Sequence, residues 1–478
     1  MLLALCDVNV RSSTSNEIGI GVNYPSVLND FVDTIVARAT PLGSGGICVV
    51  RLSGTDAVRI ADTIFVREQG GGIADSPARV LVFGTVSVGG DAIDQVLAVR
   101  FPGPRSYTGE DVVELHLHGN VAIAELVISA AVNAGARVAD PGEFTRRAFV
   151  NGRIDLTQVE ALADLLAADS RAALAAAERG LRGVIRSKLL DLRERVLSVL
   201  ARLELELDFV EEGYSFASSS EIESVLLEIL LFSRSLIADF DRGELLRRHP
   251  RVLLAGRPNA GKSSFFNASV GYDRAIVSET PGTTRDYVEE DVVVDGVRLT
   301  LIDTAGLRDT DDAVEAVGVS MARELTGRVD VVLILVDTSS EDFKAALESA
   351  RAYAGQLSDV RHFIVGTKTD VSLNEEDAEF WGVVSVHRPQ SVRELLARLA
   401  VGLTGEGTGV EVLVTERQRS LCQRMVGMVE DALASELSDT VVVSSILREM
   451  LVPLSELAGA TVTEDVLNAV FAQFCIGK

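Results

Sequence analysis

The pattern of hydrophobic and polar positions divides most of the chain into four regions. From residue 31 to 149, short apolar stretches that predict strands alternate with glycine-rich turns, and one helix-like stretch follows Asn120. The predicted strands lie in GGICVVRLSG, ARVLVFGTVSV, QVLAVRFPG and DVVELHLHG. Residues 150–248 are rich in Ala, Leu, Glu and Arg, which is typical of long helices. Strand-sized and helix-sized patterns alternate over residues 249–404, as in a parallel α/β sheet, and residues 410–478 are helical again. The pattern predicts a multidomain α/β protein.

The second helical region is small for a domain of its own. It spans residues 410–478, and a unit of roughly 70 residues buries only a modest core. We therefore expect one discontinuous α-helical domain into which residues 249–404 are inserted; two separate helical units are the alternative. Residues 404–409, TGEGTG, are expected to be a linker. Residues 1–30 are expected to be a disordered extension or the product of an upstream start codon.

Composition narrows the class of protein. Of the 478 residues, 47% are hydrophobic and 24% are charged, so each domain has enough apolar material for a core. No apolar run reaches the roughly 18 residues of a membrane-spanning helix, and the N-terminal MLLALC has no basic leader, so we predict a cytoplasmic protein that does not bind membranes. The net charge of −25 disfavours non-specific nucleic-acid binding but permits a local basic patch or a basic partner. The four cysteines lack zinc-ligand spacing.

A phosphate-binding motif follows an apolar, strand-like stretch directly. In GRPNAGKSS, Gly256, Gly261, Lys262 and Ser263 have the spacing of a P-loop. We expect its backbone N–H groups to surround the phosphates, Lys262 to neutralise their charge, and the Ser263 hydroxyl to ligate Mg²⁺. The motif predicts a nucleotide site.

Three further motifs, TPGTTRD, LIDTAG and HFIVGTKTD, follow along the chain in the order found in GTPases. LIDTAG ends a strand at Asp303, which is placed to hold the magnesium shell, and Gly306 offers an N–H to the γ-phosphate. TPGTTRD offers Thr284 as a second magnesium ligand, and HFIVGTKTD offers Lys368 and Asp370 for guanine. The motifs predict a translation-factor-like GTPase. The predicted GTP-binding positions are Asn259, Ala260, Gly261, Lys262, Ser263, Ser264, Ser278, Glu279, Thr280, Pro281, Gly282, Thr283, Thr284, Asp303, Thr304, Ala305, Gly306, Thr367, Lys368, Asp370 and Ser385.

Two departures from Ras-type enzymes constrain the hydrolysis mechanism. Leu307 replaces the glutamine that orients the attacking water, so another polar side chain must do so. The second departure is the missing arginine finger. Another positive charge must therefore offset the charge that develops between the β and γ phosphates. For this the amide oxygen of Asn259 is a candidate ligand of a monovalent cation; a loop-stabilising hydrogen bond is its alternative role. The other candidates are Arg285 and Arg308 for the charge, and Asp311, Asp312 and Glu315 for the water.

Several motifs resemble those of known GTPase families. GRPNAGKSS, PGTTRD and DTAGLR resemble the TrmE–Era–EngA group of GTPases. The stretches DTIVARATPLGSGGICVVRLSG, PRSYTGEDVVELHLHG, PGEFTRRAFVNGRIDLTQVEALADLL and CIGK are similar to the MnmE (TrmE) family of tRNA modification GTPases, from about residue 33 onward. The resemblance implies an α+β N-terminal folate-binding domain that dimerises, a discontinuous helical domain, and an inserted P-loop GTPase domain with a Ras-like α/β fold.

The resemblance also implies a reaction. Members of this family install a carboxymethylaminomethyl or aminomethyl group at C5 of the wobble uridine of certain tRNAs. They act as homodimers with a flavoprotein of the MnmG (GidA) type, in a heterotetramer or larger assembly, and FAD is expected on that partner. The one-carbon unit comes from 5,10-methylene- or 5-formyl-tetrahydrofolate. GTP hydrolysis is implied to need Mg²⁺ and K⁺, with K⁺ acting where an arginine finger would.

Family roles carry over to residues that match the motifs. Glu315 falls at the position of the catalytic glutamate that orients water, in agreement with the demand created by Leu307. The folate site implied by the family combines one glutamate with three cationic side chains, which suits the pterin edge and the glutamate tail of a folate. The alternative role of Glu114 and Arg153 is a plain ion pair. The implied ligands are Asn259, Ser278, Thr280 and Thr283 for K⁺, Ser263 and Thr284 for Mg²⁺, and Arg51, Glu114, Arg153 and Lys478 for folate.

The ending FCIGK permits two interpretations. A cysteine four residues from the end is typical of a C-a-a-X prenylation box. Gly477 and Lys478 are poor for prenyl transfer, however, and match the family's terminus. Cys475 is therefore a candidate catalytic nucleophile or proton donor toward uridine, provided that its thiol is accessible and its pKa is lowered by nearby cations.

The guanine motifs depart from the family pattern. Thr367 stands where asparagine is usual, and Ser385, Val386 and His387 replace Ser-Ala-Lys or Ser-Ala-Arg. We expect GTP specificity to be kept but weakened. The alternative function is an Era- or EngA-like ribosome-assembly GTPase, which predicts a KH-type domain or a second G domain; neither pattern occurs after Leu403.

Overall fold

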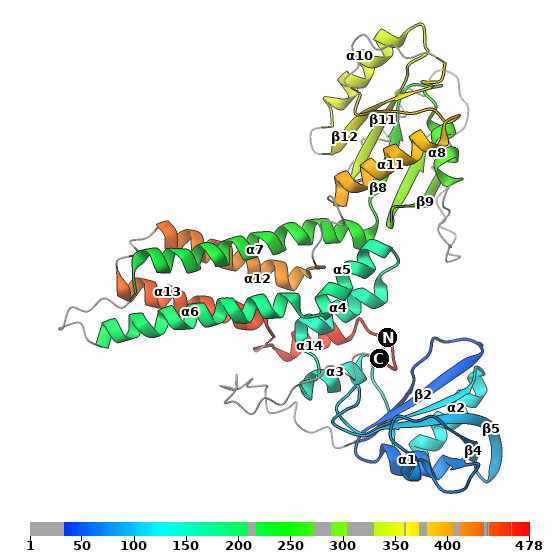
Figure 1. The fold of residues 1–478 in the computed structure, drawn as a ribbon. Helices are drawn as coiled ribbons and strands as arrows, with labels where there is room; N and C mark the ends of the chain where they lie inside the picture. The colour runs from blue at the N-terminus through cyan, green and yellow to red at the C-terminus, as the bar shows by residue number, and fades with distance from the viewer. Residues whose placement is uncertain are drawn as a thin grey trace. The chain divides into compact units, whose positions relative to one another are not determined.

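The computed structural model describes most of the chain (Figure 1). By its internal contacts the chain divides into two compact units. The described ranges are 33–208, 217–271, 288–303, 329–357, 360–371, 380–404, 412–434, 437, 439–459 and 461–478. The first unit comprises the described residues of Met1–Ala163, Leu181–Leu230 and Arg424–Lys478, and the second those of Asp164–Gly180 and Leu231–Gln423. The predicted multidomain α/β class is confirmed.

The first unit contains a sheet of seven strands among the described residues, in the order β3-β4-β5-β6-β2-β1-β7. β1 and β7 are parallel, and the other neighbours are antiparallel. The apolar stretches predicted as strands form β2, β4, β5 and β6. The bounds are β1 Ile35–Arg38, β2 Ile47–Ser53, β3 Phe65–Arg67, β4 Val82–Val88, β5 Asp91–Phe101, β6 Val112–His118 and β7 Arg137–Val138.

Alternation along β2 separates the two faces of this sheet. Cys48, Val50 and Leu52 are buried in the apolar core with helices α1 (Ala57–Ile64) and α2 (Val121–Asn133). Arg51, between them in sequence, points to the opposite face because successive strand residues alternate. That face carries Arg51 and its register partner Glu114, two of the candidate folate residues.

The prediction of a single helix in this region was incomplete. The helix after Asn120 is α2, and the Asn120 side chain accepts a hydrogen bond from the Ala122 N–H at 2.8 Å, which caps the helix. α1 and α3 (Glu143–Val150) are also present. Each has 8 residues, so the helical period repeats only about twice and does not stand out from the strand patterns around it.

The helical segments on either side of residues 249–404 pack together. α6 (Val184–Asp208) lies against α13 (Thr440–Leu457), and Arg448 on α13 forms an ion pair of 2.7 Å with Glu204 on α6. The predicted discontinuous helical domain is therefore confirmed. The other helices described before residue 249 and after residue 404 are α4 Leu156–Ala167, α5 Arg171–Leu181, α7 Ser219–Arg248, α12 Glu416–Ala434 and α14 Glu464–Phe471. Within the described part of the chain, no helix is long and apolar enough to span a membrane.

The second unit contains a sheet in the order β13-β12-β11-β8-β10-β9. All neighbours are parallel except β9 and β10. Helices α8 (Lys262–Val270) and α11 (Pro389–Thr404) cover one face, and α10 (Phe343–Ala354) covers the other. The strand bounds are β8 Arg251–Ala255, β9 Val288–Val294, β10 Val297–Asp303, β11 Val331–Asp337, β12 Arg361–Thr367 and β13 Gly382–Val383.

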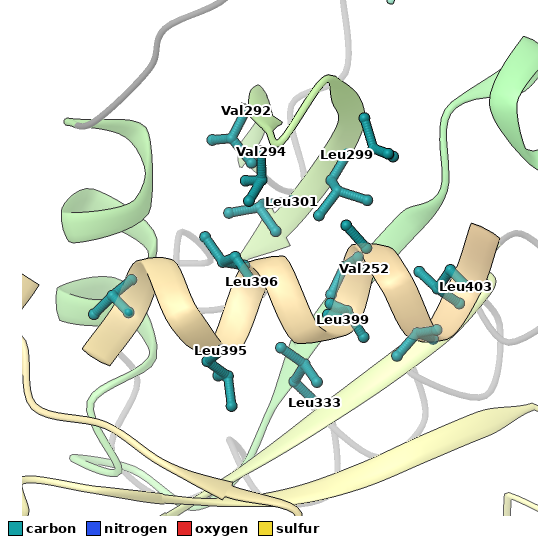
Figure 2. Packing of buried hydrophobic residues seen from close by; sticks show 14 of the residues in the cluster. Val252, Val292, Val294, Leu299, Leu301, Leu333, Leu395, Leu396, Leu399 and Leu403 are labelled. Carbon is teal, nitrogen blue, oxygen red and sulfur yellow. The ribbon is translucent and has the colours of Figure 1, made fainter. Parts of the chain in front are cut away.

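Helix α11 closes one face of this sheet (Figure 2). Leu395, Leu396 and Leu399 project from α11 toward apolar strand residues such as Val252 and Leu333. Leu253 on the same strand joins the core under α10 instead. Because both faces are buried, these strands are almost continuously apolar, as expected for a parallel sheet. The core fixes the strand ends at which the nucleotide motifs begin.

Candidate functional site

The phosphate-binding loop, residues 256–263, connects β8 to α8. Gly256 has φ +139°, and a Cβ there would lie 2.4 Å from the Leu335 carbonyl oxygen on β11, so only glycine fits. Asn259 (φ +64°) and Gly261 (φ +90°) are also left-handed. Such turns at a helix N-terminus direct backbone N–H groups inward, so the loop fits a phosphate.

Lys262 is poised at this loop. Its Nζ donates to the carbonyl oxygens of Gly256 (2.9 Å) and Arg257 (3.0 Å). Burial lowers the pKa of Lys262, and the nearby charge of Asp303 partly opposes this. Asp303 is buried at the end of β10, which pairs with β8. The carboxylate of Asp303 and the exposed hydroxyl of Ser263 are hard oxygen donors, which suits Mg²⁺ held together with phosphates.

Thr367 joins the guanine side of the site to the phosphate-binding loop. Its hydroxyl lies within donating distance of the carbonyl oxygens of Ala260 (2.7 Å) and Val336 (3.1 Å), and the residue is buried. The Thr367 side chain thus ties strand β12 to the phosphate-binding loop, a role that the guanine motif alone does not indicate. The effect of Thr367 on guanine specificity stays a prediction.

The other guanine-motif residues lie at the same edge of the sheet. Lys368 (φ +58°) forms an ion pair of 2.6 Å with Asp337 at the end of β11. Asp370 accepts a hydrogen bond of 2.5 Å from the Ser385 hydroxyl, which itself accepts from the His387 N–H at 3.1 Å. The Ser385 hydrogen bond lowers the pKa of Asp370, which favours the carboxylate form needed to accept N–H groups of guanine.

A second site surrounds Arg51 in the first unit. Arg51 and Glu114 are register partners on β2 and β6, and two guanidinium nitrogens contact one Glu114 oxygen, Nε at 2.9 Å and Nη2 at 2.8 Å. The rings of Tyr107 and Phe144 each lie 5.7 Å from the guanidinium carbon. Burial raises the pKa of Glu114, but the His116 hydrogen bond and Arg51 together outweigh it, and the net pKa is lowered.

The C-terminal residues reach this site. Burial and the Arg51 charge lower the pKa of Lys478, and the electrostatic effect of nearby Cys475 opposes this only in part. Cys475 is exposed. The structure thus brings together three predicted folate-binding residues, Arg51, Glu114 and Lys478, hereafter the Arg51 site. Arg153 lies in the turn after α3, where its backbone N–H donates to the Ala148 carbonyl oxygen at 2.8 Å.

Comparison with protein families accounts for nearly the whole chain. Residues 34–153 match the family model described as GTP-binding protein TrmE N-terminus, and residues 156–475 match the MnmE helical domain. The chain belongs to the MnmE family.

Several curated relatives of this MnmE-family chain carry the name tRNA modification GTPase MnmE. The protein of Syntrophus aciditrophicus is 39% identical over 462 residues, that of Dichelobacter nodosus 37% over 457, and that of Symbiobacterium thermophilum 38% over 467. Each match covers 93% of this chain and 99% of the relative. The match to the G domain of the T. maritima FeoB iron transporter covers 32% of this chain and 98% of that domain, at 22% identity and a TM-score of 0.24.

Other predicted MnmE-type positions lie outside the described residues, and their roles stay predictions. They include the catalytic candidate Glu315, together with Leu307, Asp311 and Asp312. The GTP- and metal-binding positions concerned are Ser278, Glu279, Thr280, Pro281, Gly282, Thr283, Thr284, Thr304, Ala305 and Gly306, and the arginine candidates are Arg285 and Arg308. Residues 1–30 and most of the expected linker also lie outside.

Sequence reasoning missed three contributors to these MnmE-type sites. Tyr107 and Phe144 flank Arg51. Both lie in the family-like stretches PRSYTGEDVVELHLHG and PGEFTRRAFVNGRIDLTQVEALADLL, but the roles carried over from the family were assigned to charged side chains only. Asp337, the partner of Lys368, had a detectable signal. It directly follows the apolar stretch VVLILV, and polar residues at the carboxyl ends of parallel strands gather at the binding edge of such sheets.

Proposed function

We propose that this chain, a GTPase of tRNA modification, uses GTP hydrolysis to support modification at C5 of the wobble uridine. It acts as a cytoplasmic homodimer with an MnmG (GidA)-type flavoprotein that carries FAD, and the added group is carboxymethylaminomethyl or aminomethyl. The observation that carries the proposal is the tie from Thr367 to Ala260, which unites the phosphate loop and the guanine edge, in a chain 39% identical to an MnmE over 93% of its length.

In the nucleotide site, the chain's residues bind and orient. The phosphate-binding loop supplies inward backbone N–H groups, and Lys262 offsets phosphate charge. Asp370 accepts from guanine, and Ser385 holds that carboxylate in place. Mg²⁺ when bound withdraws charge from the phosphates, and Ser263 with Thr284 would hold it. We assign K⁺ binding to Asn259, Ser278, Thr280 and Thr283, and water orientation to Glu315.

In the Arg51 site, the chain's residues fit an elongated anion with a hydrogen-bonding edge, such as 5,10-methylene- or 5-formyl-tetrahydrofolate. The Glu114 carboxylate, held ionised by His116 and Arg51, can accept N–H groups of a pterin. Lys478 and Arg153 supply cations for the glutamate tail. Cys475 is exposed nearby and is assigned the role of nucleophile or proton donor toward uridine. Cys475→Ser is therefore expected to lack the wobble modification.

We also propose the domain boundaries that follow from this function. Residues 1–30 are an extension, 31–149 the folate-binding and dimerisation domain, 150–248 and 410–478 the two parts of the helical domain, and 249–404 the G domain.

The decisive test is the GTP turnover rate in K⁺ against Na⁺. We expect faster turnover in K⁺, and loss of that stimulation in Asn259→Ala, because the amide oxygen is then missing from the loop. Asn267→Ala, at an exposed position on α8, is the matched control and should keep the stimulation. Equal wild-type rates in the two salts would rule out the cation mechanism.

The tRNA role has its own test. A strain that lacks the gene is expected to contain tRNA without the C5 modification, detectable by mass spectrometry of nucleosides. Complementation with Glu315→Ala should restore GTP binding but not modification, since hydrolysis drives the cycle. Full modification in the deletion strain would refute the proposed substrate.

A further inference from the structure

The last residues of the sequence dock onto the first domain through backbone contacts. Residues 474–478, hereafter the docking segment, form a β-bridge between Ile476 and Pro141, and the Gly142 N–H donates to the Cys475 carbonyl at 3.5 Å. Phe474 is buried, with its ring 6.3 Å from that of Phe471 on α14. The docking segment therefore leaves α14 through an aromatic anchor and then follows the chain just before α3.

Gly477 is the closest point of this contact. Its φ is +95°, and a Cβ there would lie 2.0 Å from the Arg38 carbonyl oxygen and 3.1 Å from the Ala39 Cα. A real Cβ cannot occupy that position, and the backbone on both sides cannot move aside as a flexible side chain would. Arg38 ends β1 and pairs with Val50 on β2. Gly477 therefore rests on the strand next to the one that carries Arg51.

The docked backbone holds two cations near each other. Lys478 follows Gly477 directly and is half-buried. The nearby positive charge of Arg51 helps to lower the pKa of Lys478, so the two cations repel each other. Arg51 is itself buried and fixed by Glu114 and two aromatic rings. Lys478 would move away from Arg51 if its backbone were free, since like charges in a partly buried site repel. The docking contact opposes that movement and creates a place for an anion.

We propose that Gly477 is a positioning residue of the Arg51 site, because its missing side chain lets the docking segment rest on β1 and so places Lys478 beside Arg51. The inference rests on the proposed folate function. The ligand group that it serves is a carboxylate, as in the glutamate tail of a tetrahydrofolate, which can bind both cations at once.

The first test is Gly477→Ala, with 5-formyl-tetrahydrofolate as the probe. We expect faster amide hydrogen exchange in peptides from residues 472–478, since the Lys478 N–H loses its 3.3 Å hydrogen bond to the Cys475 carbonyl. Equilibrium dialysis should show at least about tenfold weaker folate binding. Gly427→Ala on α12 is the matched control, because nothing lies within 4 Å of a Cβ there, and it should change neither quantity.

A double-mutant cycle separates positioning from general damage. Lys478→Gln should weaken folate binding without faster exchange, and Gly477→Ala combined with Lys478→Gln should bind no more weakly than Lys478→Gln alone. Additive losses, or unchanged exchange in Gly477→Ala, would overturn the inference. Faster exchange with unchanged folate affinity would also overturn it. If wild-type protein binds no folate, the proposed folate function fails, and the exchange result alone then decides whether Gly477 docks the segment.

Discussion

The phosphate-binding loop is shaped by consecutive residues, whereas the Arg51 site is assembled from residues at 51, 114 and 478. In the loop, left-handed positions at Asn259 and Gly261 direct backbone N–H groups inward, and these groups are the proposed phosphate ligands. In the Arg51 site, the proposed ligand contacts come from side chains. Two separate tertiary contacts must form before these side chains meet: the pairing of β2 with β6 and the docking of residues 474–478. A site of the first kind is local; a site of the second kind depends on tertiary structure.

The largest expected effect breaks the scaffold of the Arg51 site alone. Arg147 on α3 is fully buried and contacts Asp33 (2.7 Å), Glu143 (3.0 Å) and Glu110 (3.2 Å). Arg147→Met leaves the buried Glu143 carboxylate and the partly buried Glu110 carboxylate without this partner, and breaking a buried ion pair typically costs about 3–5 kcal/mol. We expect the first unit to unfold at lower urea, measured by hydrogen exchange of β2 and β6.

The second unit serves as an internal reference for that variant. Trp381 is the only tryptophan of the chain and lies in the second unit, so its fluorescence reports on that unit separately. We expect its urea midpoint to stay unchanged in Arg147→Met. Arg59→Met, which removes an exposed ion pair with Asp56, is the matched control and should leave both units unchanged. If both units of Arg147→Met unfold together at lower urea, the two sites do not depend on separate cores.

The next effect breaks the local site. Lys262→Ala removes the cation of the phosphate-binding loop, and we expect GTP turnover to fall about a hundredfold or more, as when one preorganised charge-stabilising group is lost. Folate binding should persist, because the Arg51 site lies in the other unit. Lys344→Ala, at an exposed position on α10, is the matched control. Parallel loss of folate affinity in Lys262→Ala would contradict the independence of the two sites.

The two sites differ in how far the sequence predicts them. The loop follows from GRPNAGKSS after an apolar strand, because its geometry depends on neighbours in sequence. The predicted strands and the discontinuous helical domain also follow from patterns that repeat many times. The Arg51 site was reached only through resemblance, since no local pattern specifies that β2 pairs with β6 at Arg51 and Glu114. The role proposed for Gly477 likewise depends on a tertiary contact, its close approach to the Arg38 carbonyl oxygen, which the sequence does not indicate.

A smaller effect concerns a tertiary contact within the local site. In Thr367→Val, the Ala260 carbonyl loses its 2.7 Å hydrogen bond inside a buried region, which typically costs about 1–3 kcal/mol. We expect GTP and GDP to bind roughly tenfold more weakly. Thr367→Ser keeps the hydroxyl and should bind nearly as the wild type does, as measured by fluorescent-nucleotide titration. If Thr367→Val and Thr367→Ser bind GTP and GDP equally well, the hydrogen bond between strand and loop is unimportant. The loop would then depend only on residues that are neighbours in sequence.

The smallest effect is a pH dependence confined to the Arg51 site. The folded-state pKa of Glu114 lies below its usual value of 4.5, since the His116 hydrogen bond and Arg51 outweigh the effect of burial. Ionised Glu114 therefore stabilises the first unit above pH 4.5, and this contribution is lost as the pH falls through the lowered pKa. In Glu114→Gln the contribution is missing at neutral pH, so its difference in urea midpoint from the wild type should shrink below pH 4.5.

Glu125→Gln, at an exposed position on α2, is the matched control for this titration and should follow the wild type at every pH. A difference between Glu114→Gln and the wild type that stays constant with pH would mean that Glu114 acts through packing and not through its charge. The Arg51 site would then lack the ionised acceptor that a pterin edge requires. Its assembly from distant residues would in that case serve the docking of the C-terminal residues only.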